Sequence, residues 1–114
     1  MEYTLQVIPT PQLDRLLREL REALEGLYGE RLKGLVLYGS YARGDAEPGS
    51  DIDVAVVLEG AVDVYEEVER TGDVVSRLSL QTDTFISLMF VPREGFEARA
   101  TVFLTVVNEE GVAV

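Results

Sequence analysis

The fold is decided by residues 35–58, which read LVLYGSYARGDAEPGSDIDVAVVL. The stretch begins with an aliphatic run, turns at Gly39-Ser40, and crosses a polar loop before a second aliphatic run that starts at Asp51. Short aliphatic runs bounded by glycine, proline and aspartate are typical of β-strands. The stretch therefore predicts two core strands joined by a glycine turn and a polar loop.

Two aspartates, Asp51 and Asp53, stand at the start of the second strand. Side chains two positions apart on a strand point to the same face, with Cα atoms roughly 6.5 to 7 Å apart. Carboxylates at this spacing can reach one or two hard cations, as Mg²⁺-dependent phosphoryl transfer requires. Taken alone, the pair is weak evidence, because aspartates also start strands for solubility or for turn hydrogen bonds.

The glycine turn offers groups that suit a phosphate. Gly39 has no Cβ to keep an anion from the backbone, and Ser40 adds a hydroxyl. Arg43 supplies a planar cation, which either contacts phosphate oxygens or braces the loop. A Gly-Ser pair after a strand is by itself more often only a turn.

Composition excludes several classes of protein. A net charge of −11, from 21 acidic and 10 basic residues, opposes bulk binding of nucleic acid. The absence of cysteine and histidine excludes disulfides, the usual zinc sites and Ser-His-Asp chemistry. No apolar run approaches the ~18 residues of a membrane span, so we expect a cytoplasmic protein with no membrane partner. The length of 114 residues predicts one domain over residues 1–114.

Hydrophobic periodicity predicts helices and strands in alternation. Alternating side chains favour an extended segment within residues 1–8, and leucines at helical spacing predict an amphipathic helix from Thr10 to about Gly29. Strands are expected over residues 31–38, 51–58 and 82–91, a second helix over 62–79, a last helix over 94–107, and a small terminal strand over 111–114. The near-continuous apolar character of the first strand predicts burial on both of its sides.

The other polar residues near these elements are interpreted as structural. Glu66, Glu67 and Glu69 are expected on the solvated side of the second helix. Tyr41 is expected to pack against the core, and Asp45 is expected in the solvated loop.

The Gly39-Ser40 turn and the Asp51/Asp53 pair are each weak evidence alone, but together they form a specific sequence signature. The run from Gly39 to Val54 resembles the signature of the DNA polymerase beta-like nucleotidyltransferase superfamily. It is most similar to the minimal nucleotidyltransferase (MNT) proteins, whose signature is Gly-Ser-x-Ala-Arg-Gly, a short loop and Ser-Asp-x-Asp. The leading helix and the ending Glu110-Gly111-Val112 also resemble family features. The resemblance implies an α/β (α+β) nucleotidyltransferase fold, a small mixed β-sheet with helices packed on one side.

The resemblance also implies an activity and its residues. It implies Mg²⁺-dependent transfer of a nucleoside monophosphate from a nucleoside triphosphate, with ATP favoured, to a hydroxyl acceptor. Asp51 and Asp53 match the metal-binding, catalytic aspartates, which hold one or two Mg²⁺ ions. Gly39 and Ser40 match the turn that holds the triphosphate, and Arg43 matches an arginine of the signature.

A third carboxylate usually completes the metal site in this superfamily. Asp83, at the start of the predicted third strand, is the best candidate for this catalytic and metal-binding role. A strand-start aspartate that bonds to nearby backbone explains Asp83 equally well. Without a third carboxylate at the metals, the protein would bind nucleotide and transfer it poorly or not at all.

Three functional hypotheses follow. The first is an active nucleotidyltransferase. The second is an MNT-type antitoxin or nucleotide-binding partner of a helical HEPN-type protein, because small MNT proteins are commonly paired with such a partner. The third is an inactive nucleotide-binding remnant. The sequence leaves open the base, the acceptor and whether the chain forms a homo-oligomer.

Overall fold

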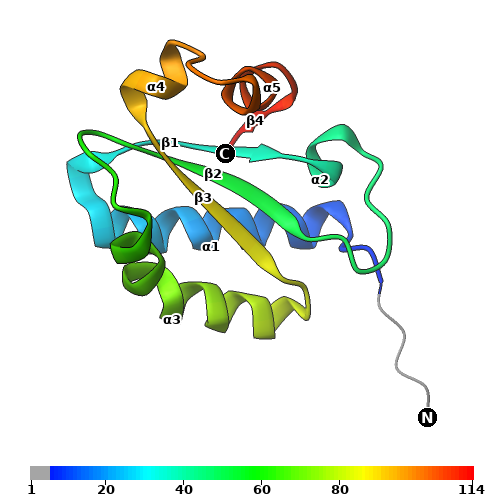
Figure 1. The fold of residues 1–114 in the computed structure, drawn as a ribbon. Coiled ribbons are helices and arrows are strands. Elements are labelled where there is room, and N and C mark those ends of the chain that lie inside the picture. The colour runs from blue at the N-terminus through cyan, green and yellow to red at the C-terminus, as the bar shows by residue number, and fades with distance from the viewer. Residues whose placement is uncertain (1–5) are drawn as a thin grey trace.

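The structure is a computed structural model that describes residues 6–114 (Figure 1). The extended segment predicted within residues 1–8 lies mostly outside the described residues. In the described part, one sheet separates two long helices on one side from two short helices on the other (Figure 1).

The sheet is mixed, as predicted. Its strands are β1 (Leu32–Tyr38), β2 (Ile52–Leu58), β3 (Ile86–Pro92) and β4 (Val112–Ala113), in the order β3-β2-β1-β4. β1 runs antiparallel to β2 and to β4, whereas β2 and β3 are parallel. A parallel pair needs a crossover connection, which the long helix after β2 provides.

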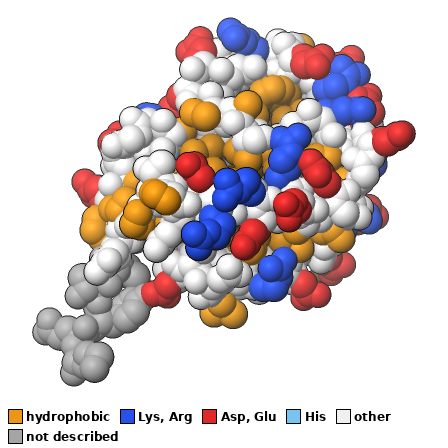
Figure 2. All heavy atoms as spheres, turned by 180° about the vertical axis from the view of Figure 1, so that it is seen from behind, with side chains coloured by type: hydrophobic (Ala, Val, Ile, Leu, Met, Phe, Trp, Pro, Cys, Tyr) orange, Lys and Arg blue, Asp and Glu red, His pale blue; other side chains and the backbone are white. Residues whose placement is uncertain are grey.

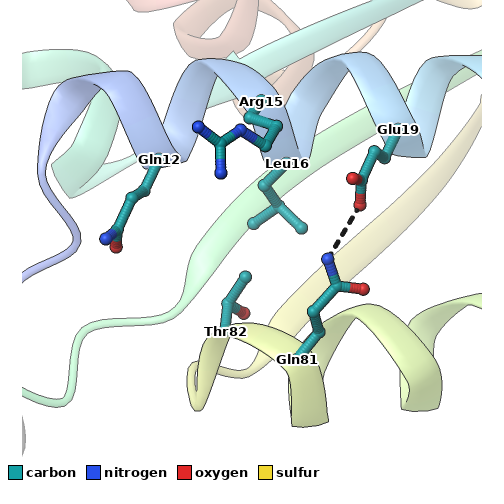
Figure 3. Close-up of a pocket in the computed structure, with 6 residues that line it drawn as sticks. All are labelled: Gln12, Arg15, Leu16, Glu19, Gln81 and Thr82. Carbon is teal, nitrogen blue, oxygen red and sulfur yellow. Dashed lines mark hydrogen bonds between the residues drawn. The ribbon is translucent and has the colours of Figure 1, made fainter.

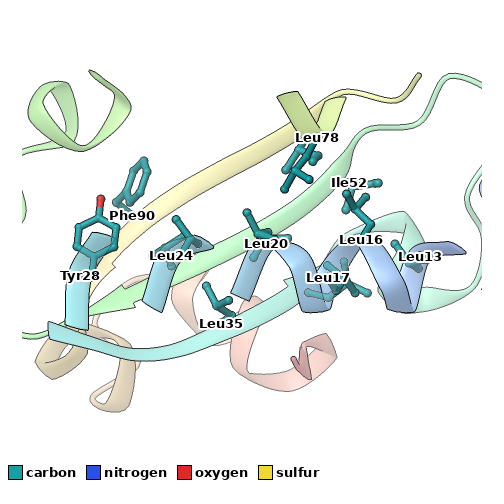
Figure 4. Packing of buried hydrophobic residues seen from close by; sticks show 14 of the residues in the cluster. Leu13, Leu16, Leu17, Leu20, Leu24, Tyr28, Leu35, Ile52, Leu78 and Phe90 are labelled. Atoms are coloured by element: carbon teal, nitrogen blue, oxygen red, sulfur yellow. The ribbon is translucent and has the colours of Figure 1, made fainter. Parts of the chain in front are cut away.

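The two long helices, α1 (Thr10–Tyr28) and α3 (Val64–Thr82), cover one face of the sheet (Figure 1). A 3₁₀ turn, η1 (Gly29–Arg31), joins α1 to β1. The helices bury the leucine stripe predicted from the sequence, and Figure 4 shows it packed against the sheet. The main members of this core are Leu13, Leu16, Leu17, Leu20, Leu24, Leu35, Ile52, Leu78 and Phe90.

The opposite face is covered only in part, by α4 (Arg93–Glu97) and α5 (Val102–Glu110). The prediction of one helix over residues 94–107 is wrong, because the chain turns between these two helices. Arg99 has a φ of 51°, and the Thr101 hydroxyl accepts the N–H of Leu104 at 3.1 Å as an N-cap.

Because α4 and α5 cover that face only in part, β1 is less buried than the sequence predicted. Within β1, Leu35 and Leu37 are buried on the side of α1, whereas the alternate side chains are only partly buried. The expected burial of β1 on both sides is therefore wrong. β2 lies between β1 and β3 and is almost entirely buried.

The third strand begins later than predicted. α3 continues to Thr82, and Asp83 then takes a left-handed conformation, with φ 55° and ψ 35°. Its N–H bonds to the carbonyl of Ser79, which ends the helix, and β3 begins only at Ile86. Aspartate is among the few non-glycine residues that adopt this conformation readily. Asp83 is therefore a helix cap, and its predicted place on a strand is wrong.

Glu67 was expected on the solvated face of the second helix, and this prediction is wrong. Its side chain is only 2% exposed. Tyr28 Oη donates to Glu67 Oε1 at 2.8 Å, Arg70 Nε donates to the same oxygen at 3.0 Å, and Arg31 Nη1 lies 3.6 Å from Oε2. The sequence pattern missed this group because two of its three partners come from another part of the chain.

No helix among residues 6–114 combines the length and the apolar character that a membrane crossing requires.

Candidate functional site

The glycine turn and the second aspartate are in direct contact. Gly39 follows β1 with φ 76° and ψ −155°, a conformation that favours glycine. A Cβ added to Gly39 would overlap the carboxylate of Asp53. Only glycine therefore allows the Asp53 carboxylate to lie against the turn.

A single helical turn, α2 (Ser40–Arg43), follows Gly39. The N–H of Arg43 donates to the carbonyl of Gly39 at 3.0 Å, and Gly44, with φ 83°, ends the turn. The structure thus brings Gly39, Ser40, Arg43 and Asp53 together where β1 ends.

Asp53 is held where its negative charge is disfavoured. It lies opposite Tyr38 in the antiparallel register of β1 and β2. Burial, and next the charge of Asp51, raise the pKa of Asp53, while Arg43 opposes this effect only in part. Burial, and next Asp53, also raise the pKa of Tyr38. A bound cation would relieve this unfavourable charge.

Asp51 is exposed and directly precedes β2. Asp51 and Asp83 both border a pocket of about 210 Å³, whose lining also includes Ser50 and Phe85. Asp53 is not part of this lining. Asp83 therefore lies on the Asp51 side of the site.

The third carboxylate is not found beside Asp53. In the parallel register of β2 and β3, the partner of Asp53 is Ser87, so the neighbouring position on this face carries a hydroxyl. Within residues 6–114, no three acidic, histidine or cysteine side chains come close enough together to hold a metal ion. The described structure does not gather Asp51, Asp53 and Asp83 into one three-carboxylate cluster.

The two remaining carboxylates still fit Mg²⁺. Among the ion pairs of the described residues, none engages Asp51 or Asp53. Mg²⁺ prefers oxygen ligands and is commonly held by one or two carboxylates together with substrate phosphates. The donor set suits a metal ion whose coordination is completed by a nucleotide.

Comparison with known proteins assigns the chain to a family. A family model described as "Nucleotidyltransferase domain" matches residues 17–108. The chain belongs to the nucleotidyltransferase domain family. Two proteins of Methanocaldococcus jannaschii are similar to this nucleotidyltransferase. "Putative protein adenylyltransferase MJ0604" is 33% identical and covers 75% of this chain and 80% of its own length. "Putative protein adenylyltransferase MJ0141" is 29% identical over 67% of this chain and 76% of its own length.

Solved structures agree on the nucleotidyltransferase fold. A toxin–antitoxin structure with AMP-PNP is similar at a TM-score of 0.62 and 22% identity, covering 84% of this chain and 69% of that chain. A structure described as a putative nucleotidyltransferase from Sulfolobus solfataricus has a TM-score of 0.54 and 25% identity, covering 87% of this chain and 78% of that one. The predicted fold class, a small mixed sheet with helices in the nucleotidyltransferase fold, is confirmed. The expectation that the helices pack on one side is not met, because α4 and α5 lie on the face opposite α1 and α3.

A larger pocket of the nucleotidyltransferase lies elsewhere. It has a volume of about 340 Å³ between α1 and α3, on the helix-covered side of the sheet (Figure 3). Gln81 Nε2 donates to Glu19 Oε2 at 3.2 Å across it. None of the residues predicted for the site lines this pocket, so size alone does not identify the site.

The face of the molecule seen from behind carries both signs of charge. In Figure 2, several Lys and Arg side chains lie next to one another near the middle of this face, with acidic side chains around and between them.

Sequence reasoning assigned no role to Glu110, which reaches the glycine turn. Glu110 Oε1 accepts the N–H of Gly39 at 3.0 Å. The one signal in the sequence is that the ending Glu110-Gly111-Val112 resembles family features, which does not say what Glu110 contacts.

Proposed function

We propose that this chain binds Mg²⁺ and a nucleoside triphosphate, with ATP preferred, and transfers the nucleoside monophosphate to a hydroxyl of a protein partner. One observation carries the proposal. The Asp53 carboxylate lies against the Gly39 turn, which places the residues suited to metal next to those suited to phosphate. Membership of the nucleotidyltransferase family supports the reaction type.

Each residue has a stated role in this proposal. Asp51 and Asp53 hold the metal ion. Gly39 and Ser40 form the turn that receives the triphosphate, with the Ser40 hydroxyl as a donor. Arg43 adds positive charge beside the phosphates. When bound, Mg²⁺ would neutralise phosphate charge and orient the α-phosphorus for in-line attack, with pyrophosphate as the leaving group.

Asp83 is assigned to the side of the site next to Asp51, where the acceptor hydroxyl would enter. Asp83 borders the same pocket as Asp51, where a carboxylate could accept the proton of the attacking hydroxyl. Because Asp83 is a helix cap and Ser87 occupies the position beside Asp53, Asp83 contributes less than Asp53.

The protein acceptor is supported by the relatives. Two relatives are named as protein adenylyltransferases, and a similar fold occurs in a toxin–antitoxin structure with AMP-PNP. A helical HEPN-type protein is the partner implied by the MNT resemblance. Loading of such a partner with AMP is the expected outcome.

A second function is favoured by the hydroxyl at Ser87. Without a third carboxylate beside Asp53, the chain would bind nucleotide and a partner, as an antitoxin does, with weak or no transfer. Binding of Mg²⁺ and ATP without turnover on a co-purified partner would support this function over the first.

The test is an assay of nucleotide transfer to proteins co-purified from the native host, with labelled ATP and intact-mass analysis. D51N/D53N should abolish transfer, with a loss of about 10³-fold or more, because several kcal/mol of charge stabilisation are removed. The matched control is E69Q/D73N, which removes two charges from the exposed surface of α3. D83N should lose about tenfold. Equal transfer by D51N/D53N and wild type would refute the assigned chemistry.

A further inference from the structure

Glu110 is fixed at the junction of α5 and β4. It is the last residue of α5, and β4 follows after Gly111, paired with Val36 and Leu37 of β1. A Cβ on Gly111 would overlap the carbonyl oxygen of Val107 and the side chain of Val36. This close packing holds the backbone at residue 111, and therefore the start of the Glu110 side chain, against the end of β1.

The Glu110 carboxylate contacts two residues of the proposed phosphate site. Gly39 N donates to Oε1 at 3.0 Å, and Arg43 Nη1 lies 3.4 Å from both oxygens. The side chain of Glu110 is 23% exposed, so the contact is partly shielded from water. One carboxylate thus joins the turn to the guanidinium.

Arg43 is held from a second side as well. Its Nε donates to Asp45 Oδ2 at 3.2 Å, which leaves the guanidinium between two carboxylates. Fixing a flexible side chain before a ligand arrives lowers the entropic cost of binding. Of the two carboxylates, only Glu110 also fixes the backbone N–H of Gly39.

We propose that Glu110 is a positioning residue for nucleotide binding, which holds the Gly39 turn and the Arg43 guanidinium in the arrangement that receives the phosphates. The inference rests on the proposed function of the same site. Glu110 need not touch the nucleotide, and it acts through Gly39 and Arg43. Its negative charge alone would weaken phosphate binding, so the two effects predict opposite results for its removal.

The experiment measures the dissociation constant of Mg²⁺-ATP by calorimetry for wild type, E110Q, E110A and E109Q. E110Q keeps an oxygen for Gly39 but loses the charge toward Arg43, and it should bind about fivefold more weakly. E110A loses both contacts and should bind about 30-fold more weakly. E109Q removes the same charge from the exposed neighbour and should bind like wild type.

A double-mutant cycle separates positioning from a general structural role. If Glu110 acts through Arg43, E110Q should have little further effect in an R43Q background. Amide hydrogen exchange of Gly39, measured without nucleotide, should speed up in E110A and not in E109Q. Circular dichroism and thermal melting establish that each variant is folded.

The outcomes are distinct. Tighter binding by E110Q would show that Glu110 opposes the nucleotide, and fully additive losses in the cycle would show that it does not act through Arg43; either overturns the inference. Unchanged binding by E110A would overturn it while leaving the proposed function intact. Failure of wild type to bind Mg²⁺-ATP would overturn both.

Discussion

Two acidic regions of this molecule are built in opposite ways. Glu67 is buried beside the hydroxyl of Tyr28 and the guanidinium groups of Arg31 and Arg70. Burial raises the pKa of Glu67 most, yet the bonds from Tyr28 and Arg70 and the charges of Arg70 and Arg31 outweigh it, so the pKa lies below the ordinary value. The folded chain stabilises the charge of this group.

At Asp53 the folded chain does the reverse. Burial and the charge of Asp51 raise its pKa, and no ion pair among the described residues engages it. The comparison teaches that an acid whose charge is satisfied serves stability, whereas an acid whose charge is left unsatisfied is available to a ligand. The following substitutions test whether Glu67 serves stability and Asp53 serves ligand binding.

The largest effect is expected from Gly39→Ala. The new methyl group would displace the Asp53 carboxylate, and a shift of about 1 Å at a reacting group can cost about 10²-fold in rate. Gly44→Ala is the matched control, because Gly44 also has a positive φ, 83°, but has open space around its Cα. Both variants should lose roughly 1 to 2 kcal/mol of stability.

Transfer assays and denaturant melts of both variants check this prediction. Only Gly39→Ala should lose transfer beyond its loss of stability. If the two variants lose transfer equally, contact between the turn and Asp53 does not matter for the reaction.

Glu67→Gln should lower the free energy of unfolding by roughly 2 kcal/mol, because charge-assisted hydrogen bonds are lost from a buried group. The partly exposed arginines can be hydrated, which limits the loss. Binding of Mg²⁺-ATP at 25 °C should not change. Urea unfolding checks the first part, with Glu69→Gln as an exposed control on the same helix. A Glu67 variant that is stable but unable to bind nucleotide would contradict the conclusion that Glu67 serves stability and not ligand binding.

A smaller effect is expected in the pH dependence of stability, compared between wild type and Glu67→Gln. Because the folded state lowers the pKa of Glu67, its stabilising contribution is present above the ordinary glutamate value of about 4.3 and is lost as pH falls through the folded value. The stability difference between wild type and Glu67→Gln should therefore shrink below about pH 4.3. Unfolding measured from pH 6 to pH 3 checks this, and a difference that stays constant would mean that Glu67 is not stabilised as an anion.

The smallest effect on stability is expected at Asp53 itself. Because the fold disfavours the charge of Asp53, Asp53→Asn should raise stability at pH 7 by up to about 0.5 kcal/mol, while transfer is lost. Thermal unfolding of the purified variant checks the gain. A clear loss of stability would mean that Asp53 has a structural role like that of Glu67.

The sequence predicted what local patterns determine. Strand periodicity and turn residues were enough to place β1, the Gly39 turn and β2, and the leucine stripe was enough for α1. The family signature joined the turn to the acid pair, and the contact between Gly39 and Asp53 gives that pairing a physical basis.

The rest depended on contacts between distant parts of the chain. Asp83 was expected on a strand because β-branched neighbours suggested one, but α3 continues to Thr82 and Asp83 ends it as a cap. Glu67 looked solvent-exposed because its partners Tyr28 and Arg31 lie far away in sequence. Glu110 reaches Gly39 only through the return of β4 to β1. No local periodicity encodes such contacts.

The bond between Gly39 and Glu110 also has a consequence for the order of folding. The two residues are 71 positions apart, so closing this contact is a late, long-range step compared with pairing β1 to β2. A chain being synthesised can form the β1–β2 hairpin well before residue 110 has emerged. Until Glu110 reaches Gly39, the turn lacks the bond that holds its N–H, so completion of the turn depends on one of the last residues of the described chain to be added.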